Sequence, residues 1–188
     1  MMLEKELKLL INGCLDNDRS SQRKLFDLTS DRVMTTCKRY CSSQEDARDL
    51  FQETYLKIFK YLESYKIEDG DIHAWIYRIT KNCIISHFHS KKIVFSPLEE
   101  ISPEDDITVQ FDQSNFQEEE ILKEIQSLPE GYRTILNLFV FESLDHEEIA
   151  AALNISESTS RSQLSRARKL LKKKLESLYT TKYEKFII

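Results

Sequence analysis

The scarcity of chain-breaking residues constrains the fold more than any other feature of this sequence. Only three glycines and three prolines occur in 188 residues. A β-sandwich or barrel needs many tight turns, and glycine and proline supply a large share of them. Apolar residues recur at three- and four-residue steps, and no segment shows the two-residue alternation of a half-buried strand. We therefore predict an all-α protein.

The few glycines and prolines indicate where helices begin and end. We expect Gly13 to end a first short helix. The apolar period predicts further helices, in chain order, over 25–34 (as one or two short helices), 47–62, 73–88 and 118–128. Pro129 and Gly131 then bracket a turn before another apolar run.

Charge divides the chain into three parts. Residues 1–92 carry 16 basic and 14 acidic side chains, residues 93–130 carry 1 and 11, and residues 131–188 carry 10 and 7. The helical period is lost over 93–117, which predicts an acidic linker between two small helical domains, 1–92 and 118–188. The linker is either a passive spacer or a polyanion that lies in a groove built for nucleic acid. Helical domains as small as these are only marginally stable alone, so we expect a larger partner to stabilise them.

The second domain contains a basic block despite the overall net charge of −5. Seven basic residues and no acidic residue lie between Arg161 and Lys174. A solvated helix face usually mixes both signs of charge, whereas such a block is typical of phosphate binding.

The residues before this block predict a helix-turn-helix. Asp145 is placed to cap a helix, and Glu148 completes a capping box. Asn154 follows where that helix must stop, because asparagine tolerates the left-handed conformation. Ser156 then caps a second helix.

The second helix has one apolar face, with Leu164, Ala167 and Leu171, and Ser160 beside them. Small polar and basic residues on the other side are candidates for DNA contact. These are Ser158, Thr159, Arg161, Ser162, Ser165, Arg166 and Lys169. A helix-turn-helix used only for packing is the alternative, and the basic outward face argues against it.

Three motifs in order, EDARDLFQETYLKIFKYL, DIHAWIYRITKNCIISHFHSKK and LPEGYRTILNLFVFESLDHEEIAAALNISESTSRSQLSRARKLL, resemble bacterial RNA polymerase sigma factors. The chain is similar to the extracytoplasmic-function (ECF) type, which retains only regions 2 and 4. The resemblance covers about residues 20–92 and 118–175.

The resemblance implies a role for each motif. A core-binding motif would dock on the clamp coiled coil of the largest polymerase subunit; it comprises Asp49, Leu50, Phe51, Gln52, Glu53 and Thr54. The loop over 63–71 would capture a flipped base of the −10 element, and Arg78, Lys81 and Asn82 on the next helix would contact that element. Residues 145–174 would read the −35 element. Trp75 is expected in the core, with a wedge that enters the DNA as the alternative.

The implied partners are core RNA polymerase and double-stranded promoter DNA with a melted −10 region. An anti-sigma factor is a further partner of this type of protein, although the sequence itself gives no sign of one. Three features depart from the family pattern. Asn154 stands where glycine is usual, Ser160 stands where valine is usual, and the loop over 63–71 is unusually acidic.

Other function classes find little support. No nucleotide-binding loop, metal motif or nucleophile triad is visible, so we expect neither an enzyme nor a cofactor. The sequence contains no stretch of about 18 uncharged apolar residues, the length that a membrane-spanning helix needs. A cytoplasmic protein is therefore expected. Cys37 and Cys41 share a helix face, which leaves a redox or metal role open. Two rival hypotheses remain: a polymerase-independent helix-turn-helix regulator, and an interaction module whose basic helix meets an acidic partner.

Overall fold

A computed structural model describes residues 4–90 and 117–184, and these form α-helices without any strand. The prediction of an all-α protein is confirmed. The chain divides into two compact units, one of residues 1–38 with 43–87 and the other of residues 39–42 with 88–188. Nearly all of the expected acidic linker over 93–117 lies outside the described residues, so the three-part domain division stays a prediction.

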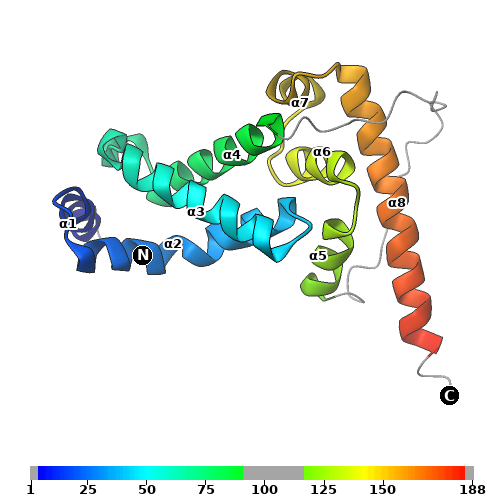
Figure 1. The fold of residues 1–188 in the computed structure, drawn as a ribbon, viewed down its shortest axis with the longest axis horizontal. Coiled ribbons are helices and arrows are strands. Elements are labelled where there is room, and N and C mark those ends of the chain that lie inside the picture. Colours follow the sequence, from blue (N-terminus) through cyan, green and yellow to red (C-terminus); the bar gives the residue numbers. More distant parts are fainter. Residues whose placement is uncertain (1–3, 91–116, 185–188) are drawn as a thin grey trace. The chain divides into compact units, whose positions relative to one another are not determined.

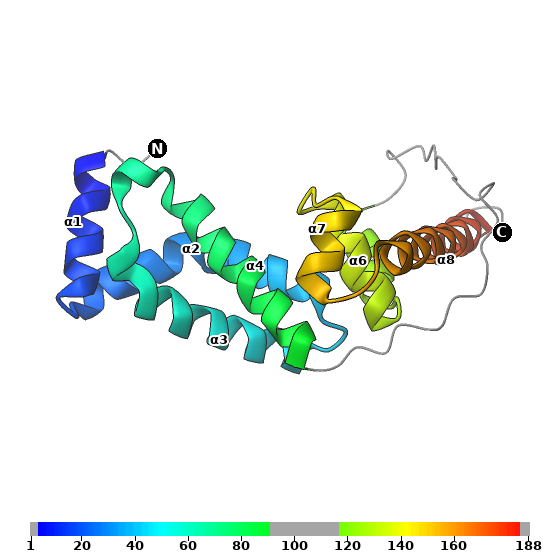
Figure 2. The same cartoon turned by 90° about the horizontal axis from the view of Figure 1, so that it is seen from above.

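Four helices build the first unit (Figures 1 and 2). They are α1 (Glu4–Leu15), α2 (Arg19–Tyr40), α3 (Gln44–Tyr61) and α4 (Ile72–Ser90). The sequence predicted one or two short helices over 25–34, but α2 is a single helix of 22 residues. Two short 3-10 turns, Leu62–Ser64 and Ile67–Asp69, connect α3 to α4.

The apolar period of α3 explains the core of this unit. Ser43 caps the helix by accepting a hydrogen bond from the backbone of Asp46 at 3.0 Å. Leu50 and Ile58 are then buried on one face. Tyr55 is also buried, and its hydroxyl lies 2.7 Å from the Thr29 hydroxyl of α2, so the polar end of the ring is satisfied.

The prediction that Gly13 ends the first helix is wrong. Helix α1 continues to Leu15, and Asn17 makes the left-handed turn with a φ of 60°. A Cβ atom at Gly13 would overlap the Ser21 side chain of α2. Glycine is therefore needed for the close approach of two helices rather than for a helix end.

The second unit contains α5 (Glu118–Gln126), α6 (Glu130–Val140), α7 (His146–Leu153) and α8 (Glu157–Glu184). Figure 1 shows α5, α6 and α7 along one side of the long α8. Helix α5 begins with a capping box between Gln117 and Glu120, which places its start where the sequence predicted. The far part of α8 holds α5 through an ion pair of 3.6 Å between Lys174 and Glu124.

None of the helices in the described ranges combines the length and the apolar character that a bilayer crossing requires.

Candidate functional site

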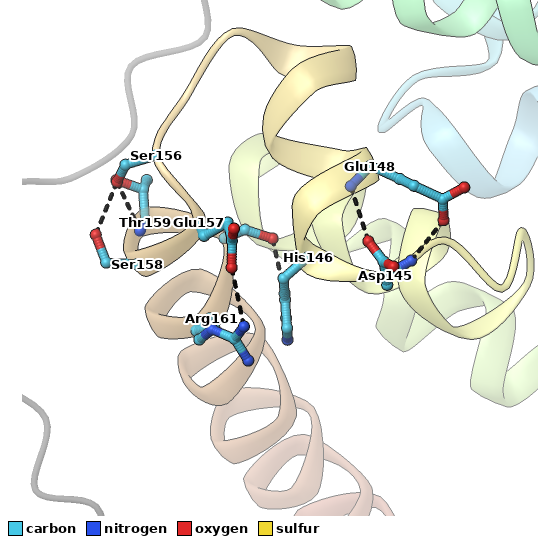
Figure 3. A network of polar contacts seen from close by, with 9 residues as sticks. Asp145, His146, Glu148, Ser156, Glu157, Ser158, Thr159 and Arg161 are labelled. Carbon is cyan, nitrogen blue, oxygen red and sulfur yellow. Dashed lines mark hydrogen bonds and ion pairs between the residues drawn. The ribbon is translucent and has the colours of Figure 1, made fainter.

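The predicted helix-turn-helix is formed by α7 and α8. The Asp145 carboxylate accepts a hydrogen bond from the backbone N–H of Glu148 at 2.8 Å, and the Glu148 carboxylate accepts one from the backbone of Asp145 at 2.9 Å (Figure 3). Asn154 ends α7 in the left-handed conformation, with φ 53° and ψ 51°. Ser156 Oγ accepts the backbone N–H of Thr159 at 3.0 Å. All three predicted helix ends are confirmed.

Small hydroxyl side chains gather at the start of α8. Ser156 Oγ lies 2.8 Å from the hydroxyls of both Ser158 and Thr159 (Figure 3). Ser158 is exposed and Thr159 is half-buried. This end of the helix is therefore narrow and polar, as insertion in a DNA groove requires.

The structure leaves every predicted DNA-contact residue of α8 at least partly accessible. Ser158, Arg161 and Lys169 are exposed, and Thr159, Ser162, Ser165 and Arg166 are half-buried. On the opposite face Leu164, Ala167 and Leu175 are buried, and Leu171, which was also predicted there, is half-buried. The two faces that the sequence separated are therefore separate in the structure.

Arg161 is engaged in an ion pair on the surface of α8. Its guanidinium lies 2.9 Å from the Glu157 carboxylate, one helical turn earlier (Figure 3). The two side chains are 63% and 49% exposed. Exposed pairs of this kind are worth about 0–1 kcal/mol, so a phosphate or a base edge can displace the glutamate at small cost.

The reasoning from sequence missed the role of His146. Ser160 is completely buried, and its Oγ lies 2.9 Å from His146 Nδ1 of α7. A hydroxyl at a core position, with a histidine at the start of the preceding helix, was the signal that could have indicated this pair.

Helix α3 presents the predicted polymerase-binding residues unequally. Asp49 and Gln52 are exposed and Glu53 is half-buried, so these three polar side chains share one accessible face. Leu50 and Thr54 lie in the core of the first unit. They hold α3 in place within that core. Half-buried Phe51 packs inward, its ring 5.9 Å from that of Phe26 and edge-on to it.

Leu56 belongs to the same face of α3, and the sequence analysis did not single it out. It follows Gln52 and Glu53 at helical steps of four and three residues. Its side chain is 73% exposed, the largest value among the exposed large apolar residues of the described ranges. A single exposed leucine is common on protein surfaces, and this one lies on the same face as the predicted polymerase-binding residues Asp49, Gln52 and Glu53.

The accessible face of α3 is also ordered by its own charges. Lys57 Nζ lies 2.7 Å from the Glu53 carboxylate. This hydrogen bond raises the pKa of Lys57, against a smaller opposing effect of burial. The glutamate is therefore held in one orientation beside Leu56.

Helix α4 carries the residues predicted to contact the −10 element. Arg78 and Asn82 are exposed one turn apart, and Lys81 is half-buried between them in sequence. Trp75 is half-buried too, and its ring lies 5.6 Å from that of Tyr65. It packs on the loop before α4 while part of it stays accessible, which is intermediate between a core residue and a surface wedge.

The loop before α4 has a defined conformation. Buried Tyr65 donates a hydrogen bond from its hydroxyl to the Gly70 carbonyl at 2.9 Å. Gly70 adopts φ 111° and ψ −162°, a region that only glycine occupies readily. The loop therefore returns to α4 through a turn that this glycine makes possible.

Comparison with known proteins gives a consistent result. Family descriptions of Sigma-70 region 2 and Sigma-70 region 4 match residues 25–93 and 118–171. The ECF RNA polymerase sigma factor SigW of Bacillus subtilis (strain 168) is 27% identical over 195 residues, covering 95% of this chain and 99% of that protein. The RNA polymerase sigma factor SigZ of the same organism is 34% identical over 160 residues, covering 81% and 85%.

A solved structure is similar at a lower level. The sigma factor RpoE, in complex with the anti-sigma factor NepR from Bartonella quintana, is 20% identical and covers 82% of this chain and 96% of that chain. Its TM-score is 0.47, so the family assignment rests on the sequence matches.

Proposed function

This chain belongs to the RNA polymerase sigma factors of the ECF type, with regions 2 and 4, and we propose how its two units divide promoter recognition between them. The first unit would bind core polymerase and the −10 element, and the second would read the −35 element. The observation that carries this division is the contrast between helices α3 and α8, α3 with an exposed leucine in a polar stripe and α8 with an exposed basic face. In residue numbers, we propose domains over 1–92 and 118–188 with an acidic linker over 93–117.

The polymerase contact is proposed for the exposed stripe of α3 formed by Asp49, Gln52, Glu53 and Leu56. Leu56 supplies the apolar centre, and the polar residues around it supply hydrogen bonds and orientation. This arrangement resembles the usual anatomy of protein interfaces, in which an apolar anchor is enclosed by a polar rim.

The −10 contact is proposed for α4 and the loop before it. Arg78 and Lys81 would neutralise phosphates, and Asn82 has the donor and acceptor groups to read an unpaired base. The half-buried Trp75 offers a partly accessible ring on which a base can stack. Unstacking a base costs a few kcal/mol, which capture by the protein offsets.

The −35 contact is proposed for the start of α8. The hydroxyls of Ser158 and Thr159 would enter the major groove, where Arg161 reaches a base edge or phosphate. The remaining candidates are Ser162, Ser165, Arg166 and Lys169, of which Lys169 suits a phosphate. The start of α8, with its narrow hydroxyl-lined end followed by a basic face, fits double-stranded DNA best as a ligand.

The linker length is compatible with both contacts at once. Residues 93–117 reach at most about 80 Å when extended. Two promoter elements about 20 base pairs apart are separated by about 70 Å. When the polymerase holds one unit on its element, the second contact becomes intramolecular, and two weak contacts give a tight complex.

The activity proposed here is binding without catalysis. A protein that works on core polymerase and promoter DNA acts where the chromosome lies, so we propose a cytoplasmic location. Regulation by an anti-sigma factor stays a prediction from the family resemblance.

The proposed division is tested by reconstitution with bacterial core RNA polymerase and run-off transcription on fragmented genomic DNA. The wild-type protein is expected to bind the polymerase and start transcripts at defined promoters. The double substitution Asp49→Ala with Gln52→Ala should remove both. The matched control, Gln22→Ala with Asp31→Ala on α2, should keep both. Tight sequence-specific DNA binding without any polymerase binding would instead favour an operator-binding regulator.

A further inference from the structure

Three helices of the second unit meet at His146. The imidazole is stacked on the Phe139 ring of α6, with 5.0 Å between ring centres and 29° between planes. Its Nδ1 lies 2.9 Å from Ser160 Oγ of α8. Figure 3 shows the ring extending from the start of α7 toward α8. The guanidinium of Arg168 lies over the same Phe139 ring at 5.3 Å. One side chain therefore connects both helices of the helix-turn-helix with the helix before them.

Ser160 depends on this histidine. Its side chain is completely inaccessible to solvent, and a buried hydroxyl that loses its partner costs about 1–3 kcal/mol. His146 supplies that partner, and Ser160 lies directly between the two predicted contact residues Thr159 and Arg161. The orientation of the reading end of α8 is thus coupled to the hydrogen bond at Ser160.

The charges around His146 favour its neutral form. Arg161 and Arg168 face it from α8, against Glu157 on α8 and Asp145 at the start of its own helix, while its neighbour on α6 is the uncharged Phe139 ring. Burial is the main cause of a lowered pKa at His146, with Arg161 and Arg168 as further causes. The first turn of a helix also disfavours a positive charge.

The sign of the pH effect follows from this shift. An unperturbed imidazole binds its proton near pH 6.5. Because the pKa of folded His146 lies below that value, the stabilisation that its neutral form provides is complete above about pH 6.5. It is lost as the pH falls through the folded-state pKa. A protonated ring can still donate to Ser160 Oγ, so the hold weakens because the charged ring is disfavoured by burial and repelled by Arg161 and Arg168.

We propose that His146 is a positioning residue for promoter reading, which in its neutral form holds α8 through Ser160 and releases that hold on protonation. This inference rests on the proposed role of α8 as the −35 reader. It gives the second unit a DNA affinity that falls in mildly acidic conditions.

The test measures binding of the full-length protein, assembled with bacterial core RNA polymerase, to a duplex that carries the −35 region of a promoter found by run-off transcription. Fluorescence anisotropy is recorded from pH 8 to pH 5.5 at constant ionic strength. Wild-type affinity should fall by up to about tenfold for each unit by which the pKa of His146 is lower in the bound protein. His146→Asn keeps an amide near the position of Nδ1 and does not titrate. It should bind within about twofold of wild type at pH 8. Between pH 8 and pH 5.5 the logarithm of its affinity should fall by less than a third of the fall seen for wild type.

Two further variants separate positioning from folding. His146→Ala should bind more weakly than His146→Asn at every pH, because it leaves the Ser160 hydroxyl unpaired. His73→Asn, in the other unit, should keep the full wild-type pH profile. An NMR titration of the imidazole signals provides a measurement free of DNA, and His146 should titrate below pH 6.5.

Two results would overturn the proposal. A pH profile of His146→Asn identical to that of wild type would overturn the positioning role alone, with DNA reading by α8 intact. The absence of binding to this duplex by the wild-type complex with core polymerase at every pH, or undiminished binding by the Arg161→Ala complex, would overturn the reading function of α8 and the role of His146 with it.

Discussion

Helices α3 and α8 solve the same structural problem and present opposite chemistry. Each buries one face in its own unit, with Leu50 and Ile58 on α3 and Leu164 and Ala167 on α8. On the outer side α3 carries acidic and amide groups around an exposed leucine, whereas α8 carries hydroxyls and cations. The buried faces alone do not distinguish a protein-binding helix from a DNA-binding one, because the difference lies in the exposed residues.

The largest effect is expected from a substitution on the exposed face of α3, measured as binding to core polymerase. Leu56→Glu should weaken binding to core polymerase by about 100-fold or more, because it places a charge at the apolar centre of the contact. The thermal midpoint should hardly change, since the side chain is 73% exposed. Binding is measured by fluorescence anisotropy of labelled protein against core polymerase. Leu28→Glu, at an exposed leucine of α2, is the control, and an equal loss there would contradict a specific role of Leu56.

A somewhat smaller effect is expected on the α8 side. Arg161→Ala should weaken binding to a −35 duplex by about 10- to 100-fold and relax the preference for one base pair, as the loss of a base contact by arginine does. The same duplex with that base pair exchanged serves as the second probe. Arg23→Ala removes a comparable exposed arginine, paired with Asp27 one turn away, and should leave the affinity unchanged. Equal loss on both duplexes would reduce Arg161 to a phosphate contact.

A substitution in the turn between α7 and α8 should change the free energy of unfolding. Asn154→Ala is expected to lower the free energy of unfolding by about 1 kcal/mol, because alanine is strained at a φ of 53°. Asn154→Gly should be neutral or slightly stabilising. Urea unfolding followed by circular dichroism measures both. A destabilised glycine variant would show that the asparagine side chain matters in itself.

The smallest effect is expected from the loss of a single charge on α8, and it tests whether the basic face of this helix contacts DNA alone. Lys169→Ala should reduce −35 affinity only a few-fold and lower the slope of log K against log salt by about 1, as loss of one phosphate contact does. The polymerase affinity of the same variant should keep its wild-type salt dependence. A change in salt dependence on the polymerase side would show that α8 contacts more than DNA.

The elements of this fold were predictable wherever local chemistry decides them. The caps at Asp145, Asn154 and Ser156 follow from hydrogen bonds between near neighbours, and all three occur as predicted. Gly13 was misjudged because its role depends on Ser21 of another helix. A close approach between helices leaves no trace in a local pattern.

The candidate surfaces show the same limit. The apolar and polar faces of α8 follow from helical spacing alone, and the structure keeps them apart. The exposure of Leu56 could not be deduced from its spacing, because a leucine at a helical step is usually buried. The contact between His146 and Ser160 joins residues 14 positions apart, and only the angle between α7 and α8 brings them together.

The ion pair between Glu157 and Arg161 has a consequence for how the protein searches a genome. In the free protein the arginine already carries a counter-charge of its own, which any random phosphate must displace. At about 1 kcal/mol, that competition shortens the dwell time on unrelated sequences by up to about fivefold. A guanine edge and a phosphate each offer two acceptors to the guanidinium, so either must displace the glutamate to bind the arginine. On the proposed reading role of α8, this exposed carboxylate would shorten the time that the helix spends on unrelated DNA.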